Sequence, residues 1–211
     1  MKKESQVIFD KNVIEFVTVA AEFCAFLERA ESMKRSTFVD TTLKILPLLY
    51  LKASMLPKCE MIGDESPDTY VTEEIYEVLR INLASILVEK DDYLEVFLPD
   101  MAYSDEPIKK NISEDLADIY QDIKDFIFVF QLGLNETMND SLAICQENFG
   151  LLWGQKLVNT MRALHDVKYS PKARGEDEEE EEYEPENNED CHCEDDDCHC
   201  HDHGCHCHDD E

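Results

Sequence analysis

Cysteine and histidine gather near the C-terminal end of this 211-residue sequence. Six of its nine cysteines and six of its seven histidines fall within residues 191–208, where the triplet Cys-His-Cys occurs three times at intervals of seven residues. Thiolate and imidazole groups are ordinary protein ligands of zinc and other late transition metals. The twelve candidate ligands are Cys191, His192, Cys193, Cys198, His199, Cys200, His201, His203, Cys205, His206, Cys207 and His208. Four such donors complete a tetrahedral zinc shell, so twelve could saturate at most about three ions.

The spacing of these ligands differs from that of a zinc finger. The triplets contain Cys-x-Cys rather than Cys-x-x-Cys, and no helix or hairpin pattern surrounds them to orient the side chains. Cys-x-Cys pairs also suit Cu(I) or Cd²⁺, and the imidazoles extend the range to Ni²⁺ and Cu²⁺. The segment resembles a flexible chelator of metallothionein or metallochaperone type. The alternative is a low-complexity tail in which metal ligation is incidental.

Acidic residues are distributed as unevenly as the metal ligands. The chain carries 49 Asp and Glu against 19 Lys and Arg, a formal net charge of −30, and residues 176–211 contain 19 of the acids without any Lys or Arg. Such a charge repels nucleic acid and anionic lipid, because phosphate binding depends on Lys and Arg that displace counterions. We expect no nucleic-acid partner and no membrane partner. Metal ions are the expected partners, and a protein partner or self-association is left open.

The start of the sequence does not resemble a signal peptide. No apolar run of the required length precedes Asp10 and Lys11, and no stretch anywhere reaches the roughly 18 apolar residues of a membrane span. These features predict a soluble cytoplasmic protein. In a reducing compartment, Cys clustered with His favours metal ligation over disulfide formation.

A change in composition separates the ligand array from the rest of the chain. Ser170 and Pro171 break the last predicted helix, and residues 176–182 are seven consecutive acids. Such a segment buries too little apolar surface to offset its ordering entropy, and its like charges repel. The predicted organisation is a helical bundle domain over residues 1–169, a disordered acidic linker over residues 170–190 and a Cys/His-rich metal-binding tail over residues 191–211.

Hydrophobic periodicity predicts that the N-terminal domain is an all-α bundle of five or six helices. Apolar residues recur at helical spacing in residues 9–30. A second apolar segment, residues 37–56, contains Pro47, which predicts either one bent helix or two short ones. A third helix is expected to begin after Thr72, whose side chain can cap it, and to stop near residues 91–92.

The second half of the domain contains two further predicted helices. Ser113 is expected to cap a fourth helix that ends at Gly133. A fifth helix is expected from about residue 137 or 139 to about residue 167, through Gly150 and Gly154, where small residues could allow close helix approach. Before the fourth helix, residues 93–110 are expected to form an extended loop, with a short helix at residues 93–97.

Several short elements of this domain together resemble a known family. Residues 113–124 read Ser-Glu-Asp-Leu-Ala-Asp-Ile-Tyr-Gln-Asp-Ile-Lys, preceded by Tyr-Leu-Glu-Val-Phe at 93–97 and followed by Trp-Gly-Gln-Lys-Leu at 153–157 and Arg-Ala-Leu-His at 162–165. The Leu-Ala-Asp-Ile-Tyr and Trp-Gly elements resemble those of small bacterial all-helical proteins known only as a domain of unknown function, over about residues 8–168. The resemblance implies a helical fold and no established activity.

The fourth predicted helix carries a row of acids on one side. The row consists of Asp115, Asp118, Asp122 and Asp125, separated by three, four and three residues. Such a row could bind a cation, but a helical di-metal site needs Glu-x-x-His pairs, and the domain has one histidine, His165, and no such pair. We interpret the row as a solvated acidic face, with Lys156 or Arg162 as its candidate ion-pair partners.

The domain offers no other motif that indicates catalysis. His165 is explained by a favourable position near a helix C-terminus, and Cys24 and Cys145 stand singly among apolar neighbours. Phosphate-binding, nucleophile-elbow and dinucleotide motifs are absent from the sequence. The resulting hypothesis is a non-catalytic protein whose Cys-His-Cys repeats bind a transition metal, with zinc as the first choice, for storage, buffering or handover. The alternative is a partner-binding adaptor bundle whose acidic tail serves only solubility or protein recruitment.

Overall fold

Helices dominate the part of the chain that the structure, a computed structural model, describes: residues 5–95 and 108–170. The helices are α1 (Lys11–Glu28), α2 (Arg35–Ser54), α3 (Glu73–Leu87), α4 (Ile112–Gln131), α5 (Asn135–Asn148) and α6 (Gly154–Tyr169), and the strands are β1 (Asp92–Glu95) and β2 (Ile108–Asn111). The predicted helical bundle is confirmed. Among the described helices, none has the length and apolar character needed to cross a membrane.

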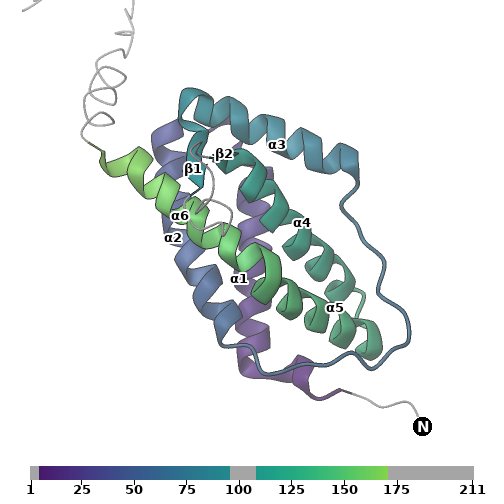
Figure 1. Cartoon of the computed structure of the whole chain (residues 1–211). Helices are drawn as coiled ribbons and strands as arrows, with labels where there is room; N and C mark the ends of the chain where they lie inside the picture. The colour runs from purple at the N-terminus through teal and green to yellow at the C-terminus, as the bar shows by residue number, and fades with distance from the viewer. Residues whose placement is uncertain (1–4, 96–107, 171–211) are drawn as a thin grey trace, which may run out of the picture.

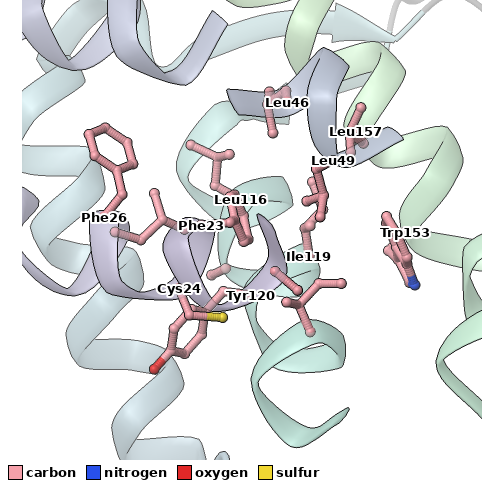
Figure 2. Packing of buried hydrophobic residues seen from close by; sticks show 14 of the residues in the cluster. Phe23, Cys24, Phe26, Leu46, Leu49, Leu116, Ile119, Tyr120, Trp153 and Leu157 are labelled. Atoms are coloured by element: carbon pink, nitrogen blue, oxygen red, sulfur yellow. The ribbon is translucent and has the colours of Figure 1, made fainter. Parts of the chain in front are cut away.

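The helices share one hydrophobic core. α1 packs on α2 and α4, α6 packs on α2 and α4, and α3 packs on α4; α3 lies across the upper end of the bundle in Figure 1. Figure 2 shows side chains from four helices converging, among them Phe23, Leu46, Leu116 and Leu157. Each large apolar side chain buried in this way contributes roughly 1.5–3 kcal/mol relative to an exposed one.

α1 forms where apolar residues recur on one face. The buried stripe of this helix includes Val13, Phe16, Ala20, Phe23, Cys24 and Leu27, as the periodicity predicts. Asp10 caps the helix, because its carboxylate accepts a hydrogen bond of 2.8 Å from the backbone N–H of Asn12.

α2 is one helix although Pro47 lies inside it. Proline has no N–H to donate one turn back, so the helix lacks one hydrogen bond there. Leu46 and Leu49 are fully buried on either side of this gap, and their packing holds both halves against the core. Of the two predicted forms, the structure contains the single helix.

α5 and α6 are joined by a π-helical turn, Phe149–Trp153, so the chain is helical from Asn135 to Tyr169. This agrees with one long predicted helix, although no periodicity rule indicated the wider turn. A Cβ added at Gly154 would lie 2.3 Å from the carbonyl oxygen of Phe149, whereas one at Gly150 would meet open space. The expected role of these glycines in helix–helix approach is therefore wrong, because the close contact at Gly154 lies within its own helical run.

The segment before α4 differs from the prediction. Residues 92–95 form β1, which pairs antiparallel with β2, with Asp92 opposite Asn111. The predicted short helix at residues 93–97 is wrong over its described part, because pairing with a distant segment satisfies the backbone there. Ser113 is not a cap either: its N–H and hydroxyl both donate to the carboxylate of Asp91, at 2.7 Å each. Asp91 thus supplies acceptors to the first turn of α4 from another segment.

A long connection between α2 and α3, residues 55–72, runs along the outer side of α5 and α4 (Figure 1). We call it the strap. Asp140 of α5 holds its middle by accepting the N–H groups of Ile62 and Gly63 at 2.7 and 2.8 Å. Gln146 holds its first part, donating to the carbonyl oxygen of Pro57 at 3.1 Å. The strap therefore follows a fixed path, although it has no helix or strand of its own.

Candidate functional site

The twelve predicted metal ligands, residues 191–208, lie outside the described residues, as does nearly all of the predicted linker. Over residues 5–95 and 108–170, no group of three or more His, Cys, Asp or Glu side chains is placed to hold a metal ion. Metal ligation by the tail therefore stays a prediction. The row of aspartates on α4 is described in full, and three of its four members border a cavity.

The cavity has a volume of about 510 Å³ and opens between α4, the α5–α6 run and the strap. We call it the α4 cleft. Its apolar lining comes from Phe126, Val129, Ile144, Leu152 and Trp153, and its polar lining from Asp118, Gln121, Asp122, Asp125, Asn148 and Lys156. Residues 66–69 of the strap form the outer wall. A volume of this size with a mainly apolar lining and a few converging polar groups is typical of small-molecule sites.

The first two aspartates of the row are engaged by side chains from other elements. Asp115 is 4% exposed and accepts a hydrogen bond from the hydroxyl of Tyr93. Asp118 accepts a hydrogen bond from Tyr76 at 2.8 Å and forms an ion pair with Lys156. Pairing of the row with Lys156 is therefore confirmed, whereas Arg162 donates instead to the carbonyl oxygen of Leu94 at 3.0 Å.

The other two aspartates accept hydrogen bonds from neutral groups. Asn148 donates to Asp122 at 2.6 Å, and the backbone N–H groups of Tyr70 and Val71 donate to Asp125 at 2.7 and 2.8 Å. Burial raises the pKa of both carboxyl groups above the usual value. The predicted solvated acidic face is therefore wrong, because Tyr93, the strap and α5 cover a row that sequence spacing alone places on an open helix.

Three titratable groups that contact the row of aspartates keep their protons at neutral pH. Burial lowers the pKa of Lys156, but its hydrogen bond and ion pair with Asp118 raise it more, so the net shift is upward. Burial, and then the hydrogen bond to a carboxylate, raise the pKa of Tyr76 and Tyr93. The cleft therefore contains a paired ammonium and a surplus of negative charge.

The structure also places the lone histidine and the cysteines of the described residues. His165 is exposed on α6, with its ring centroid 4.6 Å from that of Tyr169. Cys24 and Cys145 are buried, as predicted, and burial raises the pKa of the Cys24 thiol to about 12. Cys59 is half-buried and donates to the carbonyl oxygen of Asn139 at 3.4 Å. Buried thiols with raised pKa values are poor nucleophiles.

Sequence reasoning missed three contributors to the cleft. Asn148 contacts Asp122, but the two residues are 26 positions apart and no motif links them. Tyr70 and Val71 of the strap reach Asp125 from more than 50 positions away through backbone groups, which leave no trace in residue type. The π-helical turn that carries Trp153 likewise has no periodicity signal of its own.

Comparison with known proteins covers the folded part of the chain. The profile of a family described as "Domain of unknown function (DUF5063)" matches residues 7–170. Protein BF1032 from Bacteroides fragilis, known from a crystal structure, is 92% identical; the match covers 80% of this chain and 99% of that chain, with a TM-score of 0.73. No curated protein matches the chain. The family match agrees in extent with the resemblance predicted over about residues 8–168, and it ends before the Cys/His-rich segment.

Proposed function

The chain belongs to the DUF5063 family of domains of unknown function. We propose that it captures late transition-metal ions through its Cys/His-rich C-terminal tail, which lies beyond the part of the chain that matches the family. Zinc is the first ion proposed, and storage, buffering or handover is the proposed role. The observation that carries the proposal is the Cys-His-Cys triplet repeated three times at a period of seven residues. No residue of the folded domain is proposed to be catalytic.

The composition of residues 191–208 supports this function. Twelve of these eighteen residues are thiols or imidazoles, and the others are acids and one glycine. Such a sequence has almost nothing with which to build an apolar core, so ligation is the simplest physical reason for these side chains. The surrounding carboxylates raise the local cation concentration and offset the charge of bound metal.

The folded domain offers little competition for the same ions. The cysteines of the described residues are buried or half-buried, and burial raises the pKa values of Cys24, Cys59 and Cys145. Metal ligation requires the thiolate, so these thiols bind metal weakly. Any strong zinc uptake by the chain is therefore attributed to the tail.

Zinc titration of three chains tests the proposal. The first is the full-length protein, and the second ends at Pro171. The third is a full-length variant whose six tail cysteines are serine and whose six tail histidines are asparagine, so that every acid is kept. We expect up to about three ions on the first chain and no tight uptake by the other two. Equal uptake by all three would contradict the proposal, and would favour the adaptor with a solubilising tail if protein from cells also carried no metal.

The same titration has a pH readout. Thiols and imidazoles bind metal in their deprotonated forms, so capture releases protons and must weaken as pH falls through the histidine range. Carboxylates remain ionised between pH 8 and pH 5, so binding by acids alone would be nearly constant there. Zinc affinity that did not change between these pH values would therefore exclude the Cys/His ligands.

A further inference from the structure

The α4 cleft has features that the metal-binding proposal does not use. It is a defined cavity of about 510 Å³ in the folded domain, whereas the proposed metal ligands lie in the tail. Its walls combine carboxylates, two amides and aromatic rings. Because the residues around it come from the strap, α4 and the α5–α6 run, the fold brings together groups that are remote in sequence.

Two carboxylates of the cleft are not neutralised by the folded domain. Asp122 receives its hydrogen bond on Oδ1, and Asp125 receives both of its hydrogen bonds on Oδ1. Within the described residues, neither Oδ2 accepts a hydrogen bond and neither aspartate forms an ion pair. The ammonium of Lys156 is already engaged by Asp118. The cleft therefore favours a ligand that brings positive charge and hydrogen-bond donors.

The apolar side of the cleft favours an organic cation over an inorganic one. Leu152 is 53% exposed on this side, whereas Trp153 is 1% exposed and its indole N–H donates to the carbonyl oxygen of Cys145 at 3.1 Å, so the ring is buried and fixed in place. Phe126 and Val129 are buried, so Leu152 and the half-buried Ile144 supply the accessible apolar surface. Methylene groups gain free energy on such a surface, which a hydrated inorganic ion does not. The described residues also lack a group suited to a metal ion.

The helical wall of the cleft is itself irregular. The π-helical turn Phe149–Trp153 interrupts the α5–α6 run between Asn148 and Lys156, both of which line the cavity. Single π turns within helices frequently occur at functional sites, because the wider turn changes the direction in which following side chains point. The irregularity lies at the cavity and is independent of the acidic row on α4.

We propose that the α4 cleft binds an aliphatic ammonium ligand, such as a diamine or polyamine. An ammonium group occupies the space between Asp122 and Asp125, which lie one turn apart on α4, and the alkyl chain lies against Leu152 and Ile144. The site is separate from the metal ligands and does not depend on them.

Fluorescence of the full-length protein tests this proposal. Trp153 is the only tryptophan in the sequence and lines the cavity, so its emission reports on the cleft and not on amines bound by the acidic tail. We expect 1,5-diaminopentane and spermidine to change the emission saturably. Mg²⁺ at equal ionic strength supplies charge without methylenes, and 1-pentanol supplies methylenes without charge. Neither should reproduce the change.

Three variants locate the response. Asp122→Asn keeps the acceptor for Asn148 and should weaken diamine binding by about tenfold, because it removes a charge-assisted contact. Lys156→Met frees Asp118 and should tighten binding several-fold, a gain that misfolding cannot produce. Glu31→Gln removes an exposed acid away from the cleft and should leave binding unchanged.

The outcomes are decisive in both directions. An unresponsive Trp153, an equal response in Asp122→Asn and the unmodified protein, or an equal response to Mg²⁺ would each overturn the proposal. Titration of the variant that lacks the tail metal ligands separates the two functions. If it binds diamine normally, the cleft acts independently, whereas loss of the response would contradict the separation of the two sites.

Discussion

At the scale of single residues, Asp122 carries a charge that opposes folding. Burial raises its pKa above the usual value of 3.8. For an acid shifted in this direction, the stability associated with the protonated group is fully present below the unfolded pKa and is lost as pH rises through the folded pKa. At neutral pH the ionised side chain therefore costs stability, which is the expected trade-off at a binding site.

Asp122→Asn should make the folded domain more stable at pH 7, because the amide keeps the oxygen that accepts from Asn148 and removes the desolvated charge. The advantage should shrink as pH falls through the raised pKa of the folded state and be lost below 3.8, where the unmodified carboxyl group is protonated in both states. Urea unfolding of both proteins, followed by circular dichroism at pH 7, 5 and 3, measures the difference.

Asp40 is a control, because its pKa is shifted in the opposite direction from that of Asp122. Hydrogen bonds from Lys168 and Lys44 lower its pKa to about 2, so its contribution is present above the unfolded pKa and is lost as pH falls toward 2. Asp40→Asn should therefore destabilise the protein at pH 7 and have progressively less effect from pH 4 to pH 2. Destabilisation by Asp122→Asn at pH 7, as for Asp40→Asn, would contradict the proposed cost of the ionised Asp122.

The sequence predicted the positions of the aspartates better than their surroundings. Spacing of three and four residues placed Asp118, Asp122 and Asp125 on one side of a helix, and all three line the same cavity. Their burial depends on Tyr76, on the strap and on α5, which meet the row only in the folded chain. Helical periodicity describes one helix at a time, so it could not indicate that the face is covered.

At the scale of elements, the π-helical turn between α5 and α6 depends on glycine at one position. A side chain at Gly154 would collide with the backbone of Phe149 at 2.3 Å, and backbone cannot move aside as the end of a flexible side chain can. Gly150, in the same turn, has free space around the position of a Cβ. Substitution of Gly150 is therefore a matched control for substitution of Gly154.

Gly154→Ala should destabilise the protein by roughly 1–3 kcal/mol through overpacking. Gly150→Ala should be neutral or stabilising by up to about 1 kcal/mol, because alanine has the better helix propensity. Denaturant unfolding of both variants checks the free energies, and the emission of Trp153 reports whether the turn has changed. Equal effects of the two substitutions would show that the turn does not need glycine at position 154.

Local signals predicted elements well where they act within a few residues. Thr72 caps α3, its hydroxyl accepting the N–H of Ile75 at 3.3 Å, and Gly133 follows α4 with a φ of +74°, as its role as a stop requires. Ser113 failed as a cap because Asp91, distant in sequence, supplies the acceptor. The strands β1 and β2 were missed for the same reason, since pairing across more than ten residues leaves little local pattern.

At the scale of the whole molecule, the chain combines a folded helical domain with a C-terminal segment rich in acids, cysteine and histidine. The hydrophobic pattern was sufficient to predict the helical class and the core of α1 and α4, because burial follows periodicity in amphipathic helices. The α4 cleft could not be predicted, since it forms where three remote segments meet. The tail proposal depends on residue chemistry and needs no folded geometry.

The central claim, metal capture by the tail, is tested most directly by elemental analysis of protein purified from its cells without added metal or a metal-affinity resin. We predict zinc or another late transition metal at up to about three ions per chain, and none above background in the variant with serine and asparagine at the twelve tail positions. Equal, near-zero metal content in both proteins would contradict the claim.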